Sequence, residues 1–320
     1  MGFSGDRHGA FVALCLATLL GPSAAKACSS CGCTLSSDWT TQGYAAGTGT
    51  RLDLRFDWFN QNNYRHGRDA VSRSDVAAAG SEVQDTTINR NLTLGLDHSF
   101  DRNWGINLQL PVFNRSHETY GEAYPSRDEW VSSHSRGIGD VRITGRYQGL
   151  SADRGTGVTF GLKLPTGETD DTFKDGSPLD RGLQLGTGTT DLLLGGYRFG
   201  DLDRAWGYFA QATAQIALND DHHFRPGNGL NASAGVRYMG FESVIPQLQL
   251  NARVEKRESG AQADKPNSGA ALLYLSPGLT VPVSHRVQVY GFVQVPVYQR
   301  VNGYQIQPRY FLSGGLHYSF

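Results

Sequence analysis

Apolar and polar residues alternate from Arg51 to Phe320, in segments of about ten residues separated by breaks rich in turn-forming residues. In the first segment, RLDLRFDWF, leucines and aromatic residues occupy every second position, and charged residues lie between them. Successive side chains of a strand point to opposite faces, so each segment is predicted to be a strand with one apolar and one polar face. Tilted strands of this length cross a membrane, whereas in a soluble sandwich the polar face would meet solvent.

About twelve such segments can be counted, in keeping with the even strand numbers of bacterial barrels. They are centred on Phe56, Leu94, Leu108, Ile143, Phe160, Leu194, Ala212, Ala234, Leu250, Leu275, Val293 and Gly314. Breaks after odd segments are mostly long and hydrophilic, and those after even segments, such as DRN, GDLDR and SHR, are mostly short. Long loops at one rim and short turns at the other are typical of outer-membrane barrels. We therefore predict an all-β fold: a single antiparallel transmembrane β-barrel in the outer membrane of a Gram-negative bacterium, with a short N-terminal periplasmic segment.

Aromatic residues mark the strand ends beside the short turns. They are Trp104, Tyr147, Tyr197, Phe199, Trp206, Tyr208, Tyr238, Tyr318 and Phe320. Aromatic side chains gather at membrane interfaces, so a girdle is predicted at the periplasmic rim. Tyr197 and Phe199 reach the lipid face only if a β-bulge lies at Gly195 and Gly196, and that bulge is predicted too. The terminal aromatic residue resembles the signal by which the barrel assembly machinery recognises outer-membrane proteins.

The N-terminus is predicted to be a secretory signal peptide, residues 1–27. A charged start precedes a short apolar stretch and small residues, and the stretch is too short to span a bilayer. Residues 28–49 are predicted to form a Cys-containing periplasmic tether rich in glycine, threonine and serine. The barrel is expected to occupy residues 50–320.

Composition excludes several classes of protein. After residue 27 no segment contains the roughly 18 to 20 consecutive apolar residues of a membrane helix. The formal net charge is −1 and the pI is about 6.7, with no basic stripe, so nucleic acid is not an expected partner. No enzyme is predicted: the densest acid and imidazole cluster, DDHHF from Asp220 to Phe224, falls in a long break, where such runs are usually solvated loop tips.

The polar faces are predicted to line the lumen with charges of both signs. The basic residues are Arg51, Arg55, Arg142, Arg146, Lys163, Arg198, Arg237, Arg253 and Arg309, and the acidic ones are Asp53, Asp57, Asp97, Asp140, Asp191 and Glu255. Such a lumen is either a narrow polar pore or is closed by paired ions and amides. The tenth and eleventh segments instead turn Ala270, Leu272, Tyr274, Tyr290 and Phe292 inward. A partly apolar wall suits a small, aromatic or hydrophobic solute better than a simple ion.

Three stretches place glycine, proline and aspartate at the expected extracellular mouth. They are GIGDVRITGRY from Gly137, LKLPTGETDD from Leu162 and LGTGTTDLLLGGY from Leu185. Glycine permits sharp bends and proline ends strand pairing, so these residues are expected to frame the mouth. The candidate solute contacts in the lumen are Arg142, Arg146, Asp140, Lys163, Thr166 and Asp191. Of these, Asp140, Thr166 and Asp191 are expected near the mouth, and the alternative is that these three only shape the rim.

Together the three stretches resemble the outer-membrane barrel family named for the meta pathway of phenol degradation, whose members are described as transporters. The firm part of the resemblance runs from Gly137 to Tyr197. It implies a barrel that passes small, aromatic or hydrophobic compounds across the outer membrane.

The predicted mature N-terminus carries a thiol cluster, CSSCGC, with Cys28, Cys31 and Cys33. Three fates are open: the thiolates bind a soft metal such as copper or zinc, Cys28 and Cys31 form a disulfide, or Cys28 carries a lipid. Haem attachment is not expected, because Gly32 rather than histidine follows the CxxC pair.

The sequence thus favours an outer-membrane channel or transporter for small, aromatic or hydrophobic solutes. Its expected partners are outer-membrane lipid, a small-molecule solute and the barrel assembly machinery. The alternative is a non-conducting barrel that presents the CxxCxC segment as a metal-binding or docking module.

Overall fold

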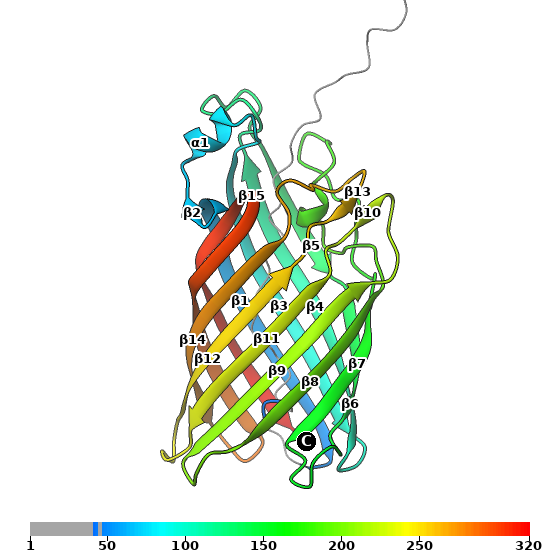
Figure 1. The fold of residues 1–320 in the computed structure, drawn as a ribbon, viewed down its shortest axis with the longest axis vertical. Helices are drawn as coiled ribbons and strands as arrows, with labels where there is room; N and C mark the ends of the chain where they lie inside the picture. Colours follow the sequence, from blue (N-terminus) through cyan, green and yellow to red (C-terminus); the bar gives the residue numbers. More distant parts are fainter. Residues whose placement is uncertain (1–40, 44–46) are drawn as a thin grey trace, which may run out of the picture.

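The fold is a closed antiparallel β-barrel, seen in a computed structural model that describes residues 41–43 and 47–320 (Figure 1). Thirteen strands form one sheet, and pairing of β15 with β1 closes it. The strands are β1 (Gly49–Gly67), β2 (Asp69–Ala70), β3 (Gln84–Ser99), β4 (Trp104–Thr119), β5 (Val131–Ile138), β6 (Val141–Tyr147), β7 (Thr156–Leu164), β8 (Asp191–Asp201), β9 (Trp206–Ala217), β11 (Gly229–Tyr238), β12 (Ile245–Glu255), β14 (Ala270–Pro282) and β15 (Val287–Ser319). β10 (Phe224–Arg225) and β13 (Ser259–Gly260) pair with each other above the barrel, and the helices are α1 (Arg73–Ala78) and η1 (Arg181–Leu183).

Two features of the strands account for the predicted number of crossings. β15 turns back at Gly303, where φ is 57°, so it crosses the wall twice: once beside β14 and once beside β1. β5 and β6 both pair with β4 and form one crossing that is interrupted after Ile138. The all-β barrel of about twelve crossings predicted from the alternation is therefore confirmed.

The two rims differ as the break lengths predicted (Figure 1). Short turns occupy the rim near the C-terminus, and aspartates cap two of them: Asp101 Oδ1 accepts hydrogen bonds from the backbone of Asn103 and Trp104, at 2.6 and 2.8 Å. Asp203 Oδ1 does the same for Ala205 and Trp206. The two backbone hydrogen bonds lower the pKa of Asp101, because they favour its ionised form. The long loops, with α1, η1, β10 and β13, lie at the opposite rim.

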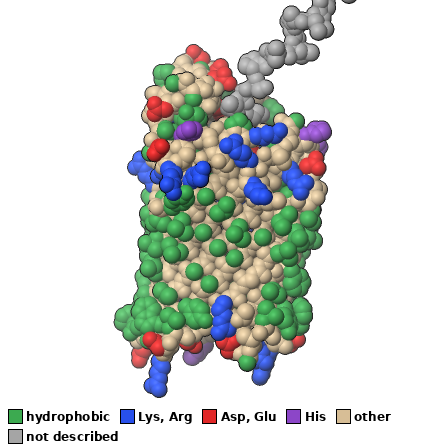
Figure 2. Space-filling view, viewed as in Figure 1, with side chains coloured by type: hydrophobic (Ala, Val, Ile, Leu, Met, Phe, Trp, Pro, Cys, Tyr) green, Lys and Arg blue, Asp and Glu red, His purple; other side chains and the backbone are tan. Residues whose placement is uncertain are grey.

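The outer face of the wall is apolar over its middle, where leucine, valine and phenylalanine side chains are exposed (Figure 2). On β3, Leu92, Leu94 and Leu96 point outward, while Asn91, Thr93 and Asp97 are buried on the lumen side. No helix among the residues described is long and apolar enough to cross a membrane.

The periplasmic aromatic girdle is present, with two members placed differently from the prediction. Exposed Trp104 lies 4.8 Å from the Tyr147 ring, and exposed Trp206 lies 5.0 Å from the Tyr238 ring, measured between centroids. Tyr197 and Phe199, in contrast, stack on each other inside the lumen at 6.1 Å.

The predicted bulge in β8 is wrong, because β8 pairs with β7 and β9 in unbroken register. Asp191 and Tyr197 therefore share the lumen face, and Arg198 points outward, where Nη2 pairs with Asp153 Oδ2 at 2.7 Å. Arg309, also predicted to face the lumen, is exposed on the outer face. An irregularity in the pairing of β1 with β15 turns both Arg309 and Tyr310 outward.

Candidate functional site

A cavity of about 400 Å³ occupies the upper lumen, walled by strands from β1 to β12. Its polar lining includes Arg55, Asp57, Asn89, Asn91, Gln109, Arg115, Asp140, Arg142, Lys163, Gln211, Gln215, Arg253 and Glu255. Its apolar lining includes Phe59, Phe113, Leu185, Leu193, Tyr197 and Phe224. The cavity volume falls within the range of small-molecule sites.

Most charges in this lining are neutralised by neighbours. Arg55 Nε lies 2.9 Å from Asp57 Oδ2, and Arg253 Nη2 lies 2.8 Å from Glu255 Oε2. The partners of each pair are two residues apart on one strand, so they share the lumen face. These pairs leave a polar wall with little net charge.

Asp140, Lys163 and Asp191, three of the predicted site residues, form one buried ion cluster. Lys163 Nζ lies 2.8 Å from Asp140 Oδ2 and 3.2 Å from Asp191 Oδ2, and it also donates to Thr187 Oγ1. Asp140 accepts further hydrogen bonds from the backbone N–H groups of Gly167 and Thr187. Because Gly167 and Thr187 belong to the long loop after β7, this cluster fixes that loop to the wall.

The three glycine-rich stretches meet at this point. Gly167 and Gly186 lie against each other, and a Cβ atom on either would overlap the other's backbone. A Cβ atom on Gly137 would likewise overlap the Leu185 side chain, and one on Gly139 would overlap the ring of Phe113. Glycine is therefore required here for close packing of the loop against the wall.

The loop between β7 and β8, residues 165–190, turns into the lumen rather than outward. Leu183 and Leu185 are buried, and Gln184, Leu185, Gly186 and Thr187 line the cavity. Arg115 Nη1 donates to the backbone carbonyls of Gly182 and Gln184, at 3.3 and 3.4 Å. This inward loop, which we call the constriction loop, narrows the barrel from above.

An ion pair at the mouth joins the constriction loop to the next long loop. Arg181 Nη2 lies 2.6 Å from Asp221 Oδ2, and its guanidinium carbon lies 4.7 Å from the Phe224 ring centroid. Burial alone would raise the pKa of Asp221, but the hydrogen bond and charge of Arg181 lower it below its ordinary value. The pair stabilises the fold above the unfolded pKa of the carboxyl group, and this stabilisation is lost as pH falls through the lowered pKa.

Arg142 lines the cavity together with two other predicted site residues, Asp140 and Lys163. Arg142, Lys163 and Asp191 are cross-strand neighbours on β6, β7 and β8. Arg142 Nη2 donates to Gln215 Oε1 at 3.3 Å, and among the described residues Arg142 makes no ion pair. Its charged neighbours are two cations, Arg253 and Arg55, and two anions, Asp191 and Asp140. Both aspartates are already paired with Lys163. It therefore has guanidinium hydrogens available for a solute in the cavity.

Three predicted residues lie outside the cavity lining: Asp191 of the ion cluster, Arg146 and Thr166. Arg146 is only 1% exposed and binds Asp97 Oδ2 at 2.7 Å and Ser99 at 2.9 Å. Thr166 Oγ1 donates to the Gly139 carbonyl at 2.7 Å and accepts from the Val141 N–H at 2.9 Å. The hydrogen bonds of both residues serve the wall.

The lower boundary of the cavity includes a turn at residues 41–43, which the sequence placed in the tether. Thr41 lines the cavity and donates to Gln211 Oε1 at 2.6 Å. Arg237 Nη1 donates to the Gln42 carbonyl at 2.6 Å. Gly43, with φ of 78°, packs on the Phe199 ring, where any side chain would clash.

Replacing Arg237 with alanine is expected to increase ionic current through the barrel. The change removes the donor that holds the Gln42 carbonyl and empties space beneath the cavity. Single-channel recording in planar bilayers checks this, with Gln247→Ala as the control. Gln247 is the cross-strand neighbour of Arg237 but bonds to Thr280 instead. Equal currents in the two variants would contradict a closing role for the turn.

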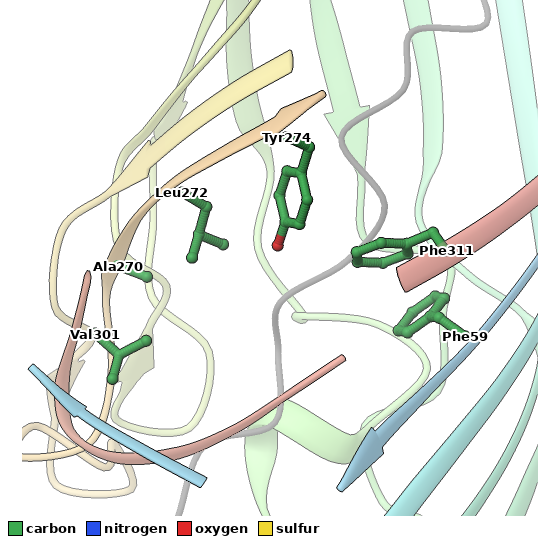
Figure 3. Close-up of a cluster of buried hydrophobic side chains, with 6 residues drawn as sticks. All are labelled: Phe59, Ala270, Leu272, Tyr274, Val301 and Phe311. Atoms are coloured by element: carbon green, nitrogen blue, oxygen red, sulfur yellow. The ribbon is translucent and has the colours of Figure 1, made fainter. Parts of the chain in front are cut away.

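The inward apolar residues predicted for the last strands are buried, as their alternation indicated. Ala270, Leu272 and Tyr274 of β14 cluster with Phe59, Val301 and Phe311 (Figure 3). The Phe311 ring lies 4.6 Å from Phe59 and 5.3 Å from Tyr274, between centroids. One side of the lumen is thus aromatic, and Phe59, a member of this cluster, also lines the cavity.

Cys28, Cys31 and Cys33 of the thiol cluster lie outside the described residues, as does the predicted signal peptide. The fates of the three thiols therefore stay predictions. Across residues 41–43 and 47–320, no group of three or more His, Cys, Asp or Glu side chains is arranged to hold a metal ion. Arg115 is missing from the predicted lining, because the hydrophilic residues 114–135 indicate a long loop, whereas β4 continues to Thr119.

No family model matches the chain, and no curated protein matches it. Among solved structures, the chain is similar to an outer membrane channel from Pseudomonas putida F1: 13% identity, 89% of this chain and 99% of that chain covered, TM-score 0.66. It is also similar to the translocator domain of the autotransporter NalP from Neisseria meningitidis: 8% identity, 88% and 92% covered, TM-score 0.50. The monoaromatic hydrocarbon channel CymD has 10% identity, 85% and 89% covered, and a TM-score of 0.44.

The fold is that of an outer-membrane barrel. Together with the apolar band and the aromatic rim, it places the chain in the outer membrane of a Gram-negative bacterium. The two structures with TM-scores of 0.50 or more are named as a channel and a translocator domain. The resemblance to the meta-pathway family stays a prediction.

Proposed function

We propose that this protein is an outer-membrane channel for small solutes, aromatic or hydrophobic ones among them. The observation that carries the proposal is the cavity, whose lining includes both Arg142 and the rings of Phe59 and Phe113. The constriction loop narrows the path above this cavity, and the cavity has the size of a small-molecule site. The fold shared with the Pseudomonas putida channel supports the proposal.

The passage is expected to run from the extracellular mouth, past the constriction loop and through the cavity. The neutralised ion pairs keep the wall polar without strong attraction for simple ions, whereas an aromatic ring can pack on Phe59, Phe113 or Tyr197. A carboxylate or hydroxyl on the solute can accept hydrogen bonds from Arg142. Small aromatic acids are therefore the first solutes to test.

The test is entry of benzoate and of neutral benzyl alcohol into liposomes that contain the purified barrel, each measured as the excess over entry into protein-free liposomes. Arg142→Gln is expected to lower benzoate entry roughly tenfold, the factor that corresponds to about 1.4 kcal/mol of lost interaction. Entry of benzyl alcohol should change much less. Arg136→Gln serves as the matched control, because Arg136 lies on the same crossing but is exposed on the outer face. A folded barrel that admits neither solute and carries no current would overturn the proposal.

A further inference from the structure

The outer face of the barrel carries arginines directly above its apolar band on the extracellular side. On β3, Arg90 points outward on the same face as Leu92, Leu94 and Leu96. It lies closer to the extracellular rim than these leucines. On the face formed by β9, β11, β12 and β14, Figure 2 shows Lys and Arg side chains in the same position, gathered above the hydrophobic zone. A charged side chain is costly in the hydrocarbon core but not at the headgroups, so Arg90 marks the height of the outer-leaflet headgroups.

A second arginine lies two strands away at a similar height. Trp58 of β1 pairs with Arg90 on one side and with Leu312 of β15 on the other. The Trp58 ring lies 5.9 Å from the Tyr310 ring. Arg309, which precedes Tyr310, is exposed, and its Nε donates to Asn63 Oδ1 at 2.8 Å. The strand irregularity that turns Arg309 outward thus places it beside two interfacial aromatic rings.

A third group lies higher on the same strands. Arg68 Nη2 donates to the Tyr298 hydroxyl at 3.1 Å, and its guanidinium carbon lies 4.8 Å from the Tyr298 ring centroid. Arg300, two residues after Tyr298, is exposed on β15 above the outward-facing Val295 and Val297. Arginine over an aromatic ring keeps its outer N–H groups free for an anion.

These four arginines lack carboxylate partners. Among the residues that the structure describes, none of Arg68, Arg90, Arg300 and Arg309 makes an ion pair. Two acidic residues lie on the neighbouring strands. Asp85 of β3 is paired with Arg73 at 2.6 Å, and Asp69 of β2 directly follows Arg68 in the sequence. Counted over residues 41–43 and 47–320, the surface therefore carries more positive than negative charge.

We propose that these four arginines form a binding site for the phosphate groups of anionic lipid in the outer leaflet, with Trp58, Tyr298 and Tyr310 at the same interface. We call this surface the seam patch, because it lies on β1, β3 and β15, where the first and last strands close the barrel. A lipid fits both parts of the surface at once. Its phosphates accept from the guanidinium groups, and its acyl chains cover Leu92, Leu94 and Val297 below.

A bound lipid would also bridge the strands of the closing seam. Arg90 on β3 and Arg309 on β15 flank β1, so one phosphorylated headgroup in contact with both would link three strands. Binding is therefore expected to raise the resistance of the barrel to thermal unfolding. This inference does not depend on whether the lumen conducts.

The experiment measures lipid retained by the detergent-purified barrel, by native mass spectrometry, and the shift in its unfolding temperature. The probes are lipid A with two phosphates, phosphatidylcholine and inorganic phosphate. Lipid A should bind and raise the unfolding temperature of the wild-type barrel, while the other two should not. The triple variant Arg90→Gln, Arg300→Gln and Arg309→Gln should bind lipid A about a hundredfold more weakly, since each lost charge near the surface weakens binding by about 1 kcal/mol.

The matched control changes the same number of charges at the opposite rim: Arg102, Arg204 and Arg286, all exposed in periplasmic turns, to glutamine. The control should bind lipid A like wild type. If the triple variant does not fold, the single variants Arg90→Gln and Arg309→Gln take its place, and each should bind less lipid A. Equal retention by wild type and variant, an equal loss in the control, or equal stabilisation by phosphatidylcholine or inorganic phosphate would overturn the proposal.

Discussion

Deletion of Phe320 is expected to remove almost all of the protein from the outer membrane. The last residue continues the seam: its backbone N–H donates to the Thr50 carbonyl at 3.1 Å, and Arg51 pairs with Ser319. Its ring is 69% exposed and makes an edge contact with Tyr318 at 4.8 Å between centroids. An aromatic ring that packs so little on its own barrel is available to another partner during assembly.

The measurement is the amount of heat-modifiable barrel in the outer-membrane fraction. We expect at least about a tenfold decrease, since a barrel strand that is not recognised and paired leaves open edges that membranes do not tolerate. Phe241→Ala is the matched control, because Phe241 is also exposed, lies in a periplasmic turn and contacts Tyr238 edge-on at 5.0 Å. Normal amounts of the truncated protein in the outer membrane would show that Phe320 has no role in recognition.

Shortening the constriction loop is expected to increase the conductance of the barrel several-fold. Replacement of residues 170–184 by a short glycine and serine linker removes the segment that Arg115 holds over the cavity. Conductance follows the cross-section of the narrowest part of a pore, and an emptied lumen of this type of barrel is a wider aqueous path. The ends of the loop remain fixed, because Asp140 still binds Gly167 and Thr187.

Planar-bilayer recordings at equal protein amounts test this expectation. The control shortens the loop between β4 and β5 by residues 123–128, which lie outside the cavity lining. That loop reaches away from the barrel mouth, so its loss should leave the conductance unchanged. Arg115→Ala should give a smaller increase than the loop replacement, because it removes two contacts and leaves the loop in place. Unchanged conductance after loop replacement would mean that another part of the lumen limits flow.

The wall of the barrel is readable from the sequence because lipid imposes one rule on every strand. Backbone groups must pair within the wall and outward side chains must be apolar, so Leu92, Leu94 and Leu96 alternate with Asn91, Thr93 and Asp97. The same period of two correctly turned Tyr274 and Phe292 inward. It also placed Arg142, Lys163 and Asp191 on one face, which the cross-strand register then brought together.

Local reasoning failed where a residue type suggested a location that the register did not allow. Tyr197 and Phe199 were assigned to the rim because aromatic residues favour interfaces, and a bulge at Gly195 was then required. The unbroken pairing of β8 keeps Tyr197 in phase with Asp191, so both face the lumen. Its ring is buried against Phe199 there, and burial inside the lumen satisfies an aromatic side chain as well as the interface does.

Contents of the lumen were decided by the tertiary structure. Thr41 bonds to Gln211 and Arg237 to Gln42 across 170 and 195 residues, and Arg115 reaches Gly182 across 67. The alternation of apolar and polar residues shows on which face of the wall a side chain lies. It carries no information about which distant loop or turn folds inward. That choice depends on buried carbonyls and guanidinium groups finding partners in three dimensions, because an unpaired polar group inside the barrel is costly.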